Sequence, residues 1–125
     1  MTPPQVQHRF ALMVCHSPDQ LLRARAAVSF ARAALEAGHQ LETIFFYQAA
    51  AAIGLATAQI SSDDYDPRRA WQELAIEHEL RLLICVGSAQ RRGVVDESLA
   101  SGFAITGLGQ WLAAMASADR VLRFP

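Results

Sequence analysis

A short apolar run meets a glycine-serine pair in Leu82-Leu83-Ile84-Cys85-Val86-Gly87-Ser88. An apolar run of this length, bounded by a turn signal, predicts a fully buried strand. The residues that follow, Ala89-Gln90-Arg91-Arg92-Gly93, predict a single helical turn. Cys85 is therefore expected at the carboxyl end of a strand, where α/β proteins hold ligands and reactive groups.

Cys85 has two interpretations from its position. Amides at the start of the following turn and the guanidinium groups of Arg91 and Arg92 favour a thiolate, which is the reactive form of cysteine. Alternatively, Cys85 is a small core hydrophobe, as many free cysteines are. The position of this residue alone leaves both interpretations open.

Outward from this stretch, strand patterns alternate with helix patterns. Such alternation predicts a single-domain, three-layer α/β fold over residues 1–125, with a mostly parallel sheet and helices on both faces. The segment 48–66 is expected to be a loop with a short helix near 49–56. The predicted strands are 9–15, 39–47, 81–86, 103–106 and 119–124. Two helices are predicted to begin near residues 17 and 66, and a third is predicted to span 107–118.

Two helices carry start signals. Ser17 is expected to cap the first helix, with Pro18 in its first turn and Gln20 closing a capping box, and Gly38 is expected to end it. Asp66 and Pro67 are expected to start the second. Apolar spacing predicts two buried faces, formed by Leu22, Ala26, Phe30, Ala33 and Ala37 and by Leu108, Trp111, Leu112 and Met115.

The composition indicates a globular protein. The chain has 125 residues, of which 52% are hydrophobic and 18% charged, which suits one domain with one core. No apolar run is long enough to span a bilayer. The first eight residues lack the charged and then apolar pattern of a secretory signal, so we expect a cytoplasmic protein.

The charged residues argue against direct binding of nucleic acid. All 11 basic residues are arginines, and the formal net charge is -1. The longest basic runs are pairs, whereas proteins that bind nucleic acid through phosphates carry a basic stripe. We expect any nucleic acid in the pathway to be held by a partner.

The remaining polar residues give no cofactor or metal site. The four histidines lack metal-ligand spacing, and Cys15-His16 is a single pair without further ligands. Cys15 is either a buried strand residue or a second thiol that resolves a persulfide or forms a transient disulfide with Cys85. Asp96 and Glu97 are expected in a surface or intersubunit salt bridge. We therefore assign no cofactor.

The run from Cys85 to Glu97, Cys85-Val86-Gly87-Ser88-Ala89-Gln90-Arg91-Arg92-Gly93-Val94-Val95-Asp96-Glu97, resembles the signature of the DsrE/TusD family of sulfur-relay proteins. Shorter matches follow the family's order along nearly the whole chain: Arg9-Phe10-Ala11, Ala37-Gly38-His39, Phe45-Phe46-Tyr47, Arg69-Ala70-Trp71, Ser101-Gly102-Phe103, Gly107-Leu108-Gly109 and Asp119-Arg120-Val121.

The resemblance implies a DsrE-like fold and a sulfurtransferase in which Cys85 carries sulfane sulfur as a persulfide. It also implies donor and acceptor proteins, and a hetero-oligomer with related small DsrE-like subunits. We expect a homo-oligomer when the chain is alone, and no contact with a membrane. The pathway is expected to be 2-thiolation of the tRNA wobble uridine; the alternatives are cytoplasmic sulfur oxidation and a non-catalytic assembly subunit.

Overall fold

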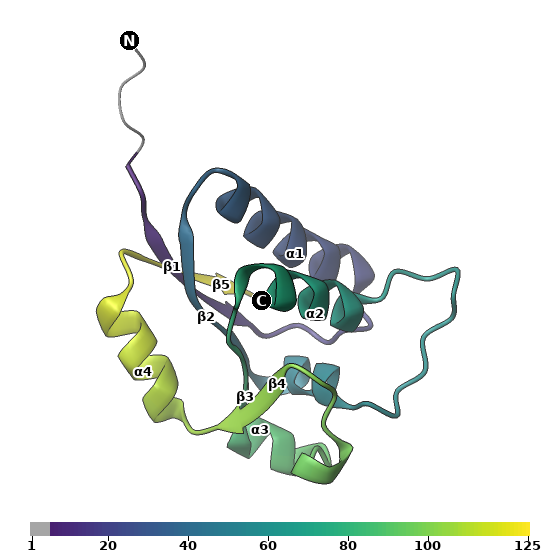
Figure 1. The fold of residues 1–125 in the computed structure, drawn as a ribbon. Coiled ribbons are helices and arrows are strands. Elements are labelled where there is room, and N and C mark those ends of the chain that lie inside the picture. Colours follow the sequence, from purple (N-terminus) through teal and green to yellow (C-terminus); the bar gives the residue numbers. More distant parts are fainter. Residues whose placement is uncertain (1–5) are drawn as a thin grey trace.

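The computed structural model describes residues 6–125, so the first five residues of the N-terminal segment considered above lie outside the described residues. Five strands form one sheet in the order β4-β3-β2-β1-β5, and every neighbouring pair is parallel (Figure 1). The predicted parallel α/β fold is thereby confirmed. The strands are β1 (Arg9–Val14), β2 (Gln40–Phe46), β3 (Leu82–Cys85), β4 (Phe103–Thr106) and β5 (Arg120–Phe124).

The long helices cover both faces of the sheet (Figure 1). Helices α1 (Leu21–Glu36) and α2 (Pro67–His78) pack on one face, and α4 (Leu108–Ser117) packs on the other. The connections through α1 and α2 step along the sheet in one direction, whereas the connection through α4 steps back across it. Because parallel crossovers are right-handed, this reversal places α4 on the opposite face.

Short helices fill the remaining connections. They are η1 (Gln48–Gly54) after β2, α3 (Val86–Arg91) after β3, and η2 (Asp96–Ser98) before β4. The helix η1 corresponds to the short helix that was predicted near residues 49–56. Every helix in residues 6–125 is too short or too polar to cross a lipid bilayer.

The sheet separates two apolar clusters. Phe46 and Ile84 face α1 and α2, where Trp71 joins them, whereas Phe45 faces α4. Successive side chains of a strand point to opposite faces, so a sheet covered on both sides needs strands that are apolar throughout. This requirement explains the continuous apolar run at residues 82–85. We call the cluster on the second face the α4-side cluster; its buried members are Ala11, Phe45, Leu83, Cys85, Trp111 and Ala114.

The start of α2 confirms its predicted signal. The carboxylate of Asp66 accepts a hydrogen bond from the backbone N–H of Arg69 at 3.1 Å, and Pro67 is the first helical residue. This N-cap satisfies one of the amides that a helix leaves unpaired at its start.

The start of α1 differs from its predicted signal. The helix begins at Leu21, and Gln20 is its N-cap without a side-chain hydrogen bond. Ser17 does not cap it, because its Oγ accepts the N–H of Asp19 at 3.3 Å in a local turn. Serine side chains commonly favour such turns over helices. The end of α1 is as predicted, since Gly38 adopts a φ of 90°.

The predicted buried face of α1 was wrong for most of its residues, although Phe30 is half-buried and packs against the core. Leu22 is 86% exposed. Small residues lie against the sheet instead, because they let the helix approach it closely. The buried residues of α1 are Ala24, Ala27, Val28, Ala31 and Ala34.

The buried face of α4 is narrower than predicted. Trp111 is buried and its ring centroid lies 5.6 Å from that of Phe45, but Leu108 and Leu112 are exposed. Ala114 is the other buried residue of this helix. A single helix covers this face of the sheet, so only the stripe of α4 that meets β2 and β1 is buried.

Candidate functional site

Cys85 lies where the sequence placed it, at the carboxyl end of a strand. It is the last residue of β3 and the N-cap of α3, with φ of -61° and ψ of 126°. All four residues of β3 are buried, and Cys85 pairs in register with Thr106 of β4. The chain therefore leaves the sheet directly after the thiol.

The side chain of Cys85 belongs to the α4-side cluster, together with Phe45 and Trp111. Cys85 is 6% exposed and forms no disulfide. Its thiol is thus shielded from bulk water by aromatic and aliphatic side chains. Cys85 is therefore buried, as expected of a core hydrophobe, and it also lies at a strand end, as expected of a reactive thiol.

A hydrogen bond joins the end of β2 to the helix that follows Cys85. The buried hydroxyl of Ser88 accepts the backbone N–H of Gln48 at 2.8 Å. Gln48 has a φ of 54°, in the left-handed region that residues other than glycine rarely adopt. Such a conformation persists where its surroundings hold it. Neither role was predictable from the sequence, because Ser88 indicated only a turn and Gln48 carries no signal for a positive φ.

The two arginines of the matched run lie at the far end of α3 from Cys85. Arg91 ends the helix, Arg92 follows it, and both are exposed. Six helical residues span about 9 Å. The guanidinium of Arg92 donates a hydrogen bond to the carbonyl of Ser88 at 3.2 Å. This side chain therefore folds back along α3 while remaining open to solvent.

The two carboxylates of the run, Asp96 and Glu97, lie on the exposed helix η2. The ion pairs formed within residues 6–125 do not include them. Their carboxylates are therefore on the surface of the isolated chain, where a partner can reach them.

Cys15 lies at the same edge of the sheet as Cys85. It directly follows β1, and its N–H donates to the carbonyl of Phe124 at 2.8 Å, which extends the pairing of β1 with β5. Cys15 is 7% exposed and is also free. Both thiols of the chain are thus buried near the carboxyl ends of strands.

His16 follows Cys15 and is also buried. Its Nδ1 lies 3.3 Å from the carbonyl of Ser17, and its Nε2 has no hydrogen-bond partner among the described residues. Burial lowers the pKa of His16 and the charge of Arg23 lowers it further, while the Ser17 carbonyl acts in the opposite direction. No group of three or more His, Cys, Asp or Glu side chains in residues 6–125 is arranged to hold a metal.

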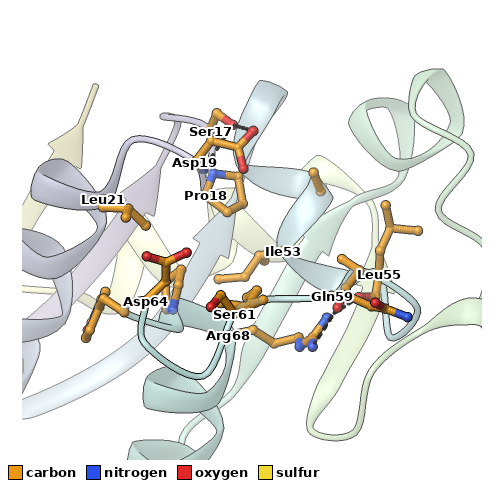
Figure 2. Close-up of a pocket in the computed structure, with 15 residues that line it drawn as sticks. Ser17, Pro18, Asp19, Leu21, Ile53, Leu55, Gln59, Ser61, Asp64 and Arg68 are labelled. Atoms are coloured by element: carbon orange, nitrogen blue, oxygen red, sulfur yellow. Dashed lines mark hydrogen bonds between the residues drawn. The ribbon is translucent and has the colours of Figure 1, made fainter.

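A cavity of about 500 Å³ lies between the turn after β1, η1 and the start of α2 (Figure 2). Ser17 and Pro18 lie on one side of it, and Arg68 reaches in from the other. The guanidinium of Arg68 donates hydrogen bonds to the carbonyls of Leu55 and Ala58, which holds the segment after η1. Cys85 is not among the described residues that line this cavity. The cavity and the thiol are therefore separate features.

Comparison with known proteins gives a family model and relatives that match most of the chain. The family model described as "DsrE/DsrF-like family" matches residues 8–124. A protein of Vibrio parahaemolyticus named "Sulfurtransferase TusD homolog" is 42% identical over 112 residues, covering 81% of this chain and 86% of its own. One of Salmonella newport named "Sulfurtransferase TusD" is 37% identical over 127 residues, covering 93% and 99%.

Two solved structures share the fold. The ychN protein from E. coli superposes with a TM-score of 0.76 at 21% identity, covering 94% of this chain and 100% of its own. The protein MTH1491 from Methanobacterium thermoautotrophicum superposes with a TM-score of 0.71 at 15% identity, covering 94% and 99%.

Proposed function

The chain belongs to the DsrE/DsrF-like family, and we propose that it takes part in sulfur transfer, with Cys85 as the residue that carries the sulfur. One observation carries this proposal: relatives named sulfurtransferase TusD match most of the chain at 37–42% identity. The position of Cys85 at the carboxyl end of β3, where α/β proteins place reactive groups, supports the choice of residue.

The proposed chemistry is thiol exchange. The thiolate of Cys85 attacks the outer sulfur of a donor persulfide, the sulfur–sulfur bond of the donor breaks, and the donor leaves as a thiolate. Cys85 then holds a persulfide, whose outer sulfur is attacked in turn by a thiolate of the acceptor. Both steps move one sulfur atom without net oxidation, so no further reactant is needed.

The burial of Cys85 suits a carrier. A persulfide in bulk water is lost to small thiols, whereas a residue that is 6% exposed is protected from them. The same burial requires that donor and acceptor proteins bind at this edge of the sheet to reach the sulfur. The exposed Asp96 and Glu97, close after α3, are charged groups that such a partner can contact.

The proposed pathway is thiolation of the tRNA wobble uridine, in the cytoplasm, where free thiols persist. The chain has no lysine and a net charge of -1, so in this proposal another protein holds the RNA. We propose that the chain forms homo-oligomers alone and hetero-oligomers with related small subunits in the cell. Co-purification from the native host tests the second part: the proposal requires small related subunits in the recovered complex.

Loading with sulfur tests the role of Cys85. The reduced protein is treated with a persulfide donor, and intact and peptide mass spectra are recorded. We expect the first sulfur atom that the protein takes up to map to Cys85. Cys85→Ser and Cys85→Ala are expected to lose it, while Cys15→Ser, which removes the other thiol, still carries sulfur on Cys85.

The carrier role of Cys85 would be contradicted if both Cys85 variants retained as much sulfur as the unmodified chain. Equal urea midpoints of the variants and the parent establish that any loss of sulfur is chemical. If no variant and no parent protein accepts sulfur from donor proteins or small persulfides, the assembly-subunit alternative gains.

A further inference from the structure

We propose that Cys15 is a second sulfur-holding site, filled from the persulfide of Cys85 within the same chain. This inference rests on the proposed carrier role of Cys85. It concerns a thiol outside the matched run from Cys85 to Glu97, and it assigns Cys15 a place in the transfer sequence.

The register of the sheet brings the two thiols to one edge. Val14, Phe46 and Ile84 are partners across the adjacent strands β1, β2 and β3. The residues that follow these three are Cys15, Tyr47 and Cys85, respectively. The N–H of Tyr47 donates to the carbonyl of Val14 at 2.9 Å, so the pairing continues to this row.

The two thiols also share a face of the sheet. His16 and Val14 line one small void with residues of α1 and α2, so both point to the α1 face. By alternation, Cys15 between them points to the α4 face. Cys85 and Tyr47 contact the α4-side cluster on this same face.

The spacing between the strands favours sulfur transfer over a disulfide. Neighbouring strands lie about 4.8 Å apart, so Cα atoms two strands apart are separated by about 10 Å. A disulfide needs Cα atoms within about 6.8 Å, so Cys15 and Cys85 cannot bridge in this fold.

A persulfide changes this limit. The outer sulfur of a persulfide on Cys85 takes the place of the second disulfide sulfur, and an attacking thiolate approaches to about 3.5 Å before reaction. Adding this gap to the disulfide limit gives a reach of about 10 Å. The row is thus too wide for a disulfide, whereas a fully extended persulfide on Cys85 matches its width.

Tyr47 is the side chain that the sulfur must pass. It is half-buried against the α4-side cluster and lies between the thiols in the row. Directly after it, Gln48 turns the backbone away with a φ of 54°. The partly exposed ring of Tyr47 is therefore the side chain that separates the two thiols at this edge of the sheet.

The transfer step is balanced. The thiolate of Cys15 attacks the outer sulfur of the Cys85 persulfide, a sulfur–sulfur bond forms on Cys15, and the bond on Cys85 breaks. Cys85 leaves as a thiolate, ready for a second donor. The proton lost by Cys15 is matched by the one that the Cys85 thiolate can take up, and no oxidant is consumed.

The test follows one equivalent of sulfur. The reduced chain is treated with one equivalent of inorganic disulfide (HSS⁻), unreacted reagent is removed, and peptide masses locate the sulfur over time. In the unmodified chain we expect sulfur on Cys85 first and then on both cysteines. In Cys15→Ser it stays on Cys85. In Cys85→Ser, loading of Cys15 is expected to be slower by at least about tenfold, because transfer within a chain profits from a high effective concentration.

A mixing control separates transfer within a chain from transfer between chains. Loaded Cys15→Ser is mixed with unloaded Cys85→Ser, and sulfur reaching Cys15 as fast as in the unmodified chain would overturn the inference. Sulfur that stays on Cys85 in the unmodified chain overturns it too, and leaves the carrier role intact. Failure of Cys15→Ser to accept any sulfur on Cys85 instead contradicts the carrier role itself.

Discussion

Gly54 packs so tightly that a single methyl group should destabilise the protein. It is the buried last residue of η1. A Cβ atom there would lie closer to Cδ1 of Ile84 than carbon atoms approach one another, 3.0 Å from Cδ1 of Leu99 and 3.5 Å from Cγ1 of Val94. Ile84 is fully buried in β3, next to Cys85, so its side chain has little room to move.

The magnitude follows from two opposing effects. Overpacking a core by one methyl group costs about 1–3 kcal/mol. Replacing glycine with alanine also restricts the unfolded chain, which stabilises by about 0.4–1 kcal/mol. Gly109→Ala is the matched control, because its Cβ meets nothing within 4 Å and it lies in α4. The control shares the second effect only, so the two variants should differ by about 1–3 kcal/mol in the free energy of unfolding.

Urea unfolding followed by tryptophan fluorescence measures this difference, since Trp71 and Trp111 are both buried. We expect a lower midpoint for Gly54→Ala, a midpoint equal to or above that of the parent for Gly109→Ala, and an unchanged slope for both. A Gly54→Ala protein as stable as the Gly109→Ala control would refute the close packing of η1 on β3.

Three further predictions concern other parts of the chain. Treatment of the reduced protein with a thiol oxidant should give no Cys15–Cys85 disulfide within a chain, as judged by mass after alkylation, because their Cα atoms are about 10 Å apart; a bridged peptide would contradict the register. Asp66→Ala should lower the free energy of unfolding by about 1 kcal/mol, measured in urea, since the N–H of Arg69 loses its acceptor. The folded-state pKa of His16 is lowered. As the pH falls below about 6.5, His16 therefore takes up a proton in the unfolded chain before it does so in the folded one. The free energy of unfolding decreases from that pH down to the folded-state pKa and is constant below it as far as His16 is concerned. His16→Asn should remove that part of the pH dependence in urea midpoints, and an identical pH profile for the variant would count against a buried neutral His16.

Local signals in the sequence predicted much of the architecture. Each predicted strand is present. The central strand β3 was the clearest, because a strand covered on both faces must be apolar throughout. The Asp66 cap was readable because its carboxylate has one strong local partner, the amide of Arg69.

The errors arose where two local solutions compete. The segment from Ser17 to Gln20 satisfies a capping box, but the serine hydroxyl bonds two residues on and forms a turn. Helix α1 carries two apolar series at helical spacing, and packing against the sheet selected the smaller side chains. Only the tertiary structure decides between such alternatives.

The candidate site shows the same division. The position of Cys85 followed from a pattern within a few residues. The bond from Gln48 to Ser88 spans 40 residues, and the row of Cys15, Tyr47 and Cys85 depends on the register of three strands. The sequence has no local signal for contacts of this kind.

The pairing of β1 with β5 also has a consequence for biosynthesis. These strands close a loop of more than a hundred residues, as the bond from the N–H of Arg9 to Asp119 shows, at 110 residues apart. A nascent chain that has assembled β1 to β4 still exposes the free edge of β1, a template for aggregation. Pairing across so long a loop slows folding, because the entropy of loop closure is lost before the contacts form. Because the N–H of Cys15 bonds to Phe124, the backbone hydrogen bonding at this thiol is completed only when the last strand docks.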